Sequence, residues 1–126
     1  MCNMWLFTKY GFFALSCDEH DDNVIMVRAR VESHLQHLKN KFEELENYQI
    51  IDTHDRDYQY RLFVPKPIWS KISYKLMEEI DYSKFKPSAQ ENLALENDPT
   101  CAKYSKLLLD IWHQTFYAFP NPDYGI

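Results

Sequence analysis

The stretch Trp5-Leu-Phe-Thr-Lys-Tyr-Gly-Phe-Phe-Ala-Leu-Ser16 decides how this chain is expected to fold. It is rich in aromatic residues, and its apolar side chains fall on both faces of an extended chain. A strand with two apolar faces belongs inside a sheet, so the sequence predicts one central strand over residues 5–16, in which Gly11 indicates a bulge or a close backbone approach. Simple alternation assigns Leu6, Thr8, Tyr10, Phe12 and Ala14 to one face and Trp5, Phe7, Lys9, Gly11, Phe13 and Leu15 to the other.

A second strand is predicted over residues 24–30, after a polar and acidic connection at 17–23. The two strands would pair as an antiparallel hairpin. Charge separates by face in the second strand, where Ile25, Val27 and Ala29 share one face and Met26, Arg28 and Arg30 share the other.

An amphipathic helix is expected next. Ser33, with Gln36 three residues later, forms a capping-box pattern that predicts the start of this helix. Its apolar stripe consists of Val31, Leu35, Leu38, Phe42 and Leu45. Two further strands, at 48–53 and 57–64, are separated by a charged turn and predict a second hairpin.

The remaining elements are helical. Pro65 ends the strand, and Pro67 suits the first turn of a helix that extends to about Ile80. The buried stripe of that helix is predicted to contain Ile68, Trp69, Ile72, Leu76 and Ile80. Residues 81–97 are polar, are interrupted by Pro87 and are expected to form a loop or a marginal turn of helix. Asp98 is then expected to cap a last helix. The stripe of this last helix contains Cys101, Tyr104, Leu108, Ile111, Trp112 and Phe116.

This order of elements predicts an α+β fold. We expect residues 1–126 to form one domain, a two-layer sandwich of a four-stranded, mainly antiparallel sheet and three helices, in the order ββαββαα. The set of elements is loosely ferredoxin-like. That fold, however, has a helix between its first two strands, and the connection at 17–23 is too short to supply one.

Composition narrows the function classes. Two glycines in 126 residues leave no glycine-rich loop to bind a nucleotide phosphate, and a net charge of −5 repels nucleic acid and anionic membranes, so any such binding has to be local. Cys2, Cys17 and Cys101 are widely spaced and fit no metal motif, which indicates reduced thiols. The sequence has no signal-peptide pattern and no apolar run long enough for a membrane span, so a cytoplasmic location is expected.

Three short motifs carry a resemblance at the level of sequence. They are WLFTKYGFF at 5–13, VIMVRAR at 24–30 and YRLFVPK at 60–66. Together they resemble a family of small uncharacterised bacterial proteins. The resemblance supplies no activity, cofactor or catalytic residue.

The strongest candidate site is a sheet face on which basic and aromatic side chains interleave. Alternation predicts that this face carries Phe7, Lys9, Phe13, Arg28, Arg30, Arg61 and Phe63. Aromatic rings stack on bases and cations neutralise phosphates, as on sheet surfaces that bind single-stranded nucleic acid. Two simpler interpretations stay open: the arginines solvate the face, or the last helix covers it.

Other polar clusters have simpler structural explanations. Asp52, His54, Asp55 and Asp57 could bind a metal or perform acid–base chemistry, but their spacing matches no metal loop and aspartates are common in turns. The acidic run 18–22, which includes His20, is interpreted in the same way. His34 and His37 lie one helical turn apart but lack a third ligand, so no metal or cofactor is expected.

These observations favour a non-catalytic binding or adaptor module. Its partner would be another protein or a second copy of the chain, with single-stranded nucleic acid as a further possibility and no role for a membrane. The alternative is a small phosphodiester-acting, nuclease-like enzyme that uses the arginine-lined face with a histidine as acid–base. The last helix is predicted to belong to the core; alternatively, its stripe is exposed and docks onto a partner.

Overall fold

The stretch 5–16 folds back on itself in the computed structural model, which describes residues 3–80 and 98–123. Strand β1 (Met4–Thr8) pairs antiparallel with β2 (Gly11–Cys17), so the predicted single central strand is wrong. Thr8 holds the turn: its Oγ1 donates to the Gly11 carbonyl oxygen at 3.0 Å and accepts from the Tyr10 amide at 3.1 Å. Gly11 has a φ of 138°, a conformation that side-chain-bearing residues rarely adopt.

The reversal also changes which side chains share a face. Leu6 lies opposite Phe13 and Phe7 lies opposite Phe12, so each pair points to one side of the sheet. Phe13 is fully buried in the main core, whereas the Phe7 and Phe12 rings stack at 4.5 Å on the other face. The alternation predicted for residues 5–16 therefore fails across the turn.

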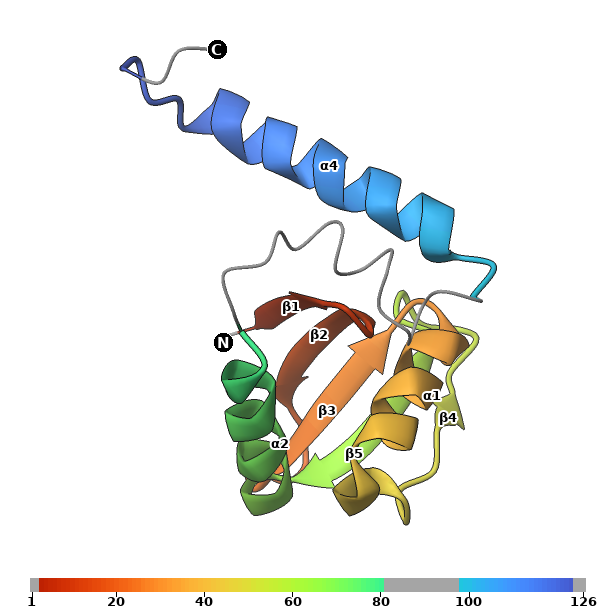
Figure 1. Cartoon of the computed structure of the whole chain (residues 1–126). Coiled ribbons are helices and arrows are strands. Elements are labelled where there is room, and N and C mark those ends of the chain that lie inside the picture. Colours follow the sequence, from red (N-terminus) through yellow and green to blue (C-terminus); the bar gives the residue numbers. More distant parts are fainter. Residues whose placement is uncertain (1–2, 81–97, 124–126) are drawn as a thin grey trace.

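The architecture is α+β, with a five-stranded antiparallel sheet in the order β1-β2-β3-β5-β4 (Figure 1). The four strands predicted become five because the first folds into two. No helix separates the first three strands, so the order is not ferredoxin-like. The remaining elements are β3 (Val24–Ala29), α1 (Glu32–Lys41), a 3-10 turn (Glu43–Leu45), β4 (Ile51–Asp52), β5 (Tyr60–Pro65), α2 (Lys66–Glu78) and α4 (Cys101–Ala118).

Helices α1 and α2 cover one face of the sheet and enclose the main core. The buried members of this core come from both layers and include Phe13, Leu15, Val27, Ala29, Leu35, Leu38, Leu62, Val64, Trp69 and Ile72. The apolar face predicted for the second strand, with Val27 and Ala29, is confirmed. Burial of these side chains stabilises the fold because each removes apolar surface from water.

The N-terminus of helix α1 differs from the one predicted. Its N-cap is Val31, which offers no side-chain cap, and Ser33 lies inside the helix, so the capping-box prediction is wrong. The apolar stripe itself is confirmed, with Leu35, Leu38 and Phe42 buried and Leu45 continuing it in the 3-10 turn.

Helix α2 follows the prediction at its start. Pro67 lies in its first turn, and Trp69 and Ile72 are buried. Ile80 lies beyond the end of the helix at 76% exposure, so its predicted place in the stripe is wrong. The loop predicted for 81–97 lies outside the described residues.

Among the described residues, helix α4 packs on the sheet through its first half. Tyr104 and Leu108 are buried against Phe7 and Phe12, on the sheet face opposite α1 and α2. Beyond them the helix extends away from the sheet (Figure 1), and Trp112 is 44% exposed. The prediction that the whole stripe belongs to the core is therefore wrong. Within residues 3–80 and 98–123, no helix combines the length and apolar composition needed to cross a bilayer.

Candidate functional site

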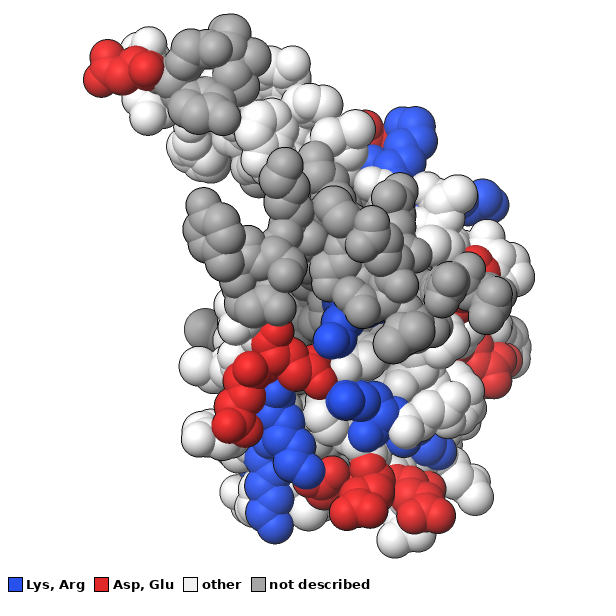
Figure 2. Space-filling model, in the orientation of Figure 1, with Lys and Arg blue, Asp and Glu red and all other residues white. Residues whose placement is uncertain are grey.

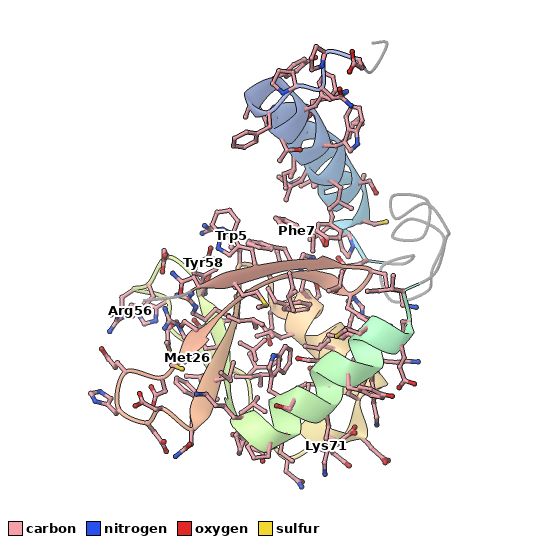
Figure 3. The ribbon with its side chains drawn as sticks, turned by 90° about the vertical axis from the view of Figure 1, so that its left-hand side faces the viewer. Trp5, Phe7, Met26, Arg56, Tyr58 and Lys71 are labelled. Carbon is pink, nitrogen blue, oxygen red and sulfur yellow. The ribbon has the colours of Figure 1, made fainter. Side chains whose placement is uncertain are left out.

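All four arginines of the chain gather on the sheet face opposite α1 and α2. Arg28 on β3 and Arg61 on β5 are register partners, Arg30 follows β3, and Arg56 lies in the 53–59 loop. Figure 3 shows Arg56, Tyr58 and Met26 together on this side of the sheet, away from the helices. We call this surface the arginine face and define it by Trp5, Met26, Arg28, Arg30, Arg56, Tyr58, Arg61 and Phe63.

Lysines follow a different pattern. On the side covered by α1 and α2, basic and acidic side chains alternate over the surface (Figure 2). There Lys9 and Lys41 each lie 3.6 Å from Glu79, and Lys75 pairs with Glu44. Lysines are therefore paired with glutamates on the helical side, and the arginines lie on the opposite face together with Asp55 and Asp57 of the 53–59 loop.

Tyr58 is the centre of the arginine face. The 53–59 loop folds back so that its ring is buried, at 6% exposure. The guanidinium carbons of Arg28 and Arg30 lie 4.8 and 4.3 Å from the ring centroid, within the range of cation–π attraction. The Tyr58 ring thus holds two cations side by side. The centroid of the Phe12 ring lies 6.3 Å from the Tyr58 centroid, so Phe12 packs against this ring.

Arg61 is buried, at 8% exposure, beneath this pair. Its Nε donates to the Tyr58 carbonyl oxygen at 3.3 Å, and its Nη2 lies 3.8 Å from an Asp57 carboxylate oxygen. Burial lowers the pKa of Arg61 below its ordinary value, and the nearby charges of Arg28 and Arg56 lower this pKa further. The nearby charges of Asp57 and Asp55 act in the opposite direction, so carboxylates of the 53–59 loop partly offset the repulsion among the arginines.

Apolar side chains surround the arginines. Trp5 is 63% exposed on β1, and Phe63 is 38% exposed on β5. Trp5 lies in the same cross-strand row as Arg28 and Arg61, whereas Met26 on β3 is the register partner of Phe63. Met26 and Phe63 therefore form an apolar row next to the row of arginines.

The predicted site residues separate into two groups. Arg28, Arg30, Arg61 and Phe63 lie together as predicted, and Phe7 lies on the same side beneath α4. Lys9 instead lies in the β1–β2 turn beside Glu79, and Phe13 is in the core. Both were misplaced because the turn reverses the alternation. The prediction missed Trp5, Met26, Arg56 and Tyr58. Two of these carried a sequence signal, because Trp5 alternates with Phe7 and Met26 alternates with Arg28.

A second polar cluster joins α4 to α1 and β2 through His34, which is 5% exposed. The β2–β3 pairing ends at Ala14 and Arg28, so the Phe12 amide lies past it and donates to His34 Nδ1 at 3.3 Å. Because Nδ1 accepts, the neutral ring carries its hydrogen on Nε2, which donates to Thr100 Oγ1 at 3.2 Å. This tautomer leaves Nε2 unable to act as a base toward Thr100.

Asp98 ends this chain of hydrogen bonds. Its Oδ1 accepts from the hydroxyl and the amide of Thr100, each at 2.7 Å, and His37 Nε2 lies 2.8 Å from its Oδ2. Burial opposes ionisation of Asp98, but hydrogen bonds from Ser33, Thr100 and His37 outweigh it and hold the pKa of Asp98 well below its usual range. Asp98 thus lies at the start of α4 as predicted, although the N-cap residue itself is Thr100.

The other predicted clusters do not assemble into a site. Asp52 accepts from the Gln59 side chain, and Asp57 accepts from the Tyr58 amide, so both shape the 53–59 loop. In the described part of the chain, no three His, Cys, Asp or Glu side chains gather in a way that could hold a metal ion.

Comparisons with known proteins add nothing to these observations. No protein-family model matches the chain, and neither curated proteins nor solved structures gave a match. The functional argument therefore depends on the geometry of the arginine face.

Proposed function

We propose that this protein is a non-catalytic binding module whose arginine face binds an acidic segment of another polypeptide. The observation that carries the proposal is the convergence of all four arginines around Tyr58 in a chain with a net charge of −5. Arginine presents a planar set of donors that matches a carboxylate in a bidentate geometry. Tyr58 orders two of these groups before any partner arrives, which lowers the entropic cost of binding.

The surroundings of the arginines favour a polypeptide over a nucleic acid. Met26 and the exposed Ile51 lie on the same side as the arginines and provide aliphatic surface, which packs against side chains better than it stacks on bases. The net negative charge of the molecule also repels a polyanion at long range, whereas a short acidic segment interacts mainly with the local cations.

Phosphodiester chemistry is the alternative, and it needs a histidine near the arginines that can transfer protons. Both ring nitrogens of His34 are engaged with Phe12 and Thr100, and His37 is bound to Asp98. These two histidines therefore stabilise the attachment of α4. That chemistry would therefore have to use His54, which is exposed in the same loop as Arg56.

The proposal can be tested with a fluorescein-labelled poly-glutamate peptide and fluorescence anisotropy. Arg30→Glu combined with Arg56→Glu should weaken binding by about tenfold or more, because both side chains are exposed and their charge is reversed. The matched control is Lys66→Glu combined with Lys71→Glu, which changes the net charge equally on exposed positions of α2. The control should bind the peptide within about twofold of the unaltered protein.

Two results would contradict the proposal. Equal loss in both variants would mean that the peptide senses only net charge. Tighter, Arg56-dependent binding of a labelled oligothymidylate than of the peptide would assign the face to single-stranded nucleic acid.

A further inference from the structure

We propose that the acidic segment bound by the arginine face is the β2–β3 turn, residues 18–22, of a second copy of this chain. The inference rests on the proposed function and names the partner. The turn has the sequence Asp18-Glu-His-Asp-Asp22, which carries a carboxylate at four of five positions. Most of these residues are exposed, and the turn leads directly into β3, the strand that carries Arg28.

The opposite charges lie at opposite ends of the same strands. Val24 begins β3 next to the acidic turn, and Arg28 lies near the other end of that strand. At the rise of a β-strand, these two positions are about 13 Å apart. Met26 lies midway between them and pairs with Phe63 on β5. Along the strands the face therefore runs from acidic, through apolar, to basic.

This pattern is self-complementary under a two-fold rotation. An axis that lies in the interface and crosses the strands at Met26 and Phe63 would place two sheets face to face with their strand directions reversed. The arginines of each copy would then lie over the acidic turn of the other, and the apolar centres would meet. Such an isologous contact closes at two copies, because each residue pair occurs twice.

The turn keeps its shape without using all its carboxylates. Asp21 Oδ1 accepts from the Asn23 amide at 2.9 Å, and the Asp21 carbonyl oxygen accepts from the Val24 amide at 3.1 Å. Glu19 and Asp22 are exposed in the turn. Glu19 approaches only the exposed His20 imidazole, at 3.5 Å. These two carboxylates are therefore the ones offered to a partner's arginines.

The size of the face predicts a weak dimer. Outside the part covered by α4, the six-residue strands β3 and β5 and the two-residue β4 span roughly 12 by 20 Å, or about 250 Å² of flat surface per copy, whereas stable complexes bury about 800 Å² per partner. Association should therefore depend on concentration in the micromolar range. Helix α4 packs on Phe7 and Phe12 at the β1–β2 side of this face and rises beside Trp5 and Phe7 in Figure 3, so the contact with a second copy would be made by β3, β5 and β4.

Sedimentation velocity on the whole chain, from about 5 to 500 µM, provides the test. The unaltered protein should shift from monomer to dimer over this range. Arg30→Glu with Arg56→Glu should stay monomeric, because both contacts become acid against acid. Glu19→Lys with Asp22→Lys should stay monomeric for the opposite reason, and this variant leaves Asp21 in place to keep the turn intact.

An equimolar mixture of the two variants supplies the decisive result. In the mixed dimer one contact keeps its native charges and the other has both signs reversed, so attraction returns at both and the mixture should sediment as a dimer. Circular dichroism confirms that each variant is folded. If a charge-reversal variant does not fold, a neutral double variant takes its place: Arg30→Gln with Arg56→Gln, or Glu19→Gln with Asp22→Gln. Each neutral variant should weaken the dimer at least about threefold.

Failure of the dimer inference can be distinguished from failure of the proposed function. A monomer at every concentration, a dimer insensitive to both variants, or a mixture that stays monomeric would overturn the inference about the second copy. Arg56-dependent binding of the poly-glutamate peptide by such a protein would leave the proposed function standing. If the protein also failed to bind the peptide, both the dimer inference and the proposed function would be contradicted.

Discussion

His34 shows how one side chain can organise several elements. Its ring lies so close to Gly11 that a Cβ at that position would stand 2.3 Å from His34 Cγ. The glycine is therefore required twice, by its positive φ and by the histidine that packs on it. In return the histidine satisfies the Phe12 amide past the end of the β3 ladder and connects it to Thr100.

The stability of the fold should depend on the protonation of His34. Burial lowers the pKa of His34 to about 4 from an ordinary value of 6.5; the Asp98 charge opposes this shift, and His37 adds to it. Because the unfolded chain binds a proton more readily, the neutral ring's contribution to stability is complete above pH 6.5 and is lost as the pH falls toward 4. The loss should be on the order of 3 kcal/mol, measured by urea unfolding at several pH values.

The matched control for this prediction is a histidine that is exposed. His34→Gln should flatten the dependence of the unfolding free energy on pH between 6.5 and 4. His20→Gln should leave it unchanged, because the His20 side chain is 84% exposed. An unchanged slope in His34→Gln would assign the acid sensitivity to another group.

At the scale of elements, α4 is a helix with two different halves. Its first half is held by Tyr104, whose hydroxyl donates to the Thr8 carbonyl oxygen at 2.7 Å, and by the Asp98 and Thr100 hydrogen bonds. Burial raises the pKa of Tyr104 well above its ordinary value, so the hydroxyl remains a donor at any working pH. Its second half projects from the sheet and exposes Tyr117, and Phe119 at the C-cap is exposed as well.

Neighbouring leucines on α4 should respond differently to truncation. Leu108→Ala removes a side chain that is buried against Phe7 and Phe12, and should cost about 2–4 kcal/mol of unfolding free energy. Leu109→Ala changes the next residue, which is 39% exposed, and should cost less than about 1 kcal/mol. Urea denaturation of the two variants gives the comparison, and equal costs would mean that α4 packs along both faces.

At the scale of the whole molecule, charge is segregated. Arginines occupy one end of the sheet face, carboxylates occupy the turn at the other end, and lysines are balanced by glutamates on the helical side. Fold stability depends mainly on the apolar core, whereas the proposed association depends mainly on exposed charges. The two properties should therefore be separable.

Salt concentration should affect the proposed association and the fold stability differently. Raising NaCl from about 50 to 500 mM shortens the screening length several-fold, and should raise the dimer dissociation constant about tenfold. The thermal unfolding midpoint of the monomeric Arg30→Glu, Arg56→Glu variant should move little over the same range, because its core is apolar. A dimer that tightens with salt would indicate an apolar interface, such as the second half of α4.

Elements whose signals are local could be predicted from the order of residues alone. β-branched residues over 24–29, the leucine spacing of α1 and the position of Pro67 each predict structure within a few residues, and each is confirmed. Alternation along β3 also placed Arg28 opposite the core, which is why part of the arginine face could be predicted. These features depend on periodicity, which a chain carries before it folds.

Only the tertiary structure decided the features that depend on distant contacts. The turn at Lys9 and Tyr10 lacks the usual hairpin residues and is fixed by Thr8, by Gly11 and by His34, which lies on another element. Because that turn was missed, Phe13 and Lys9 were assigned to the wrong side of the sheet. The burial of Tyr58 between Arg28 and Arg30 likewise arises when the 53–59 loop folds onto β3, a packing choice that no local pattern encodes.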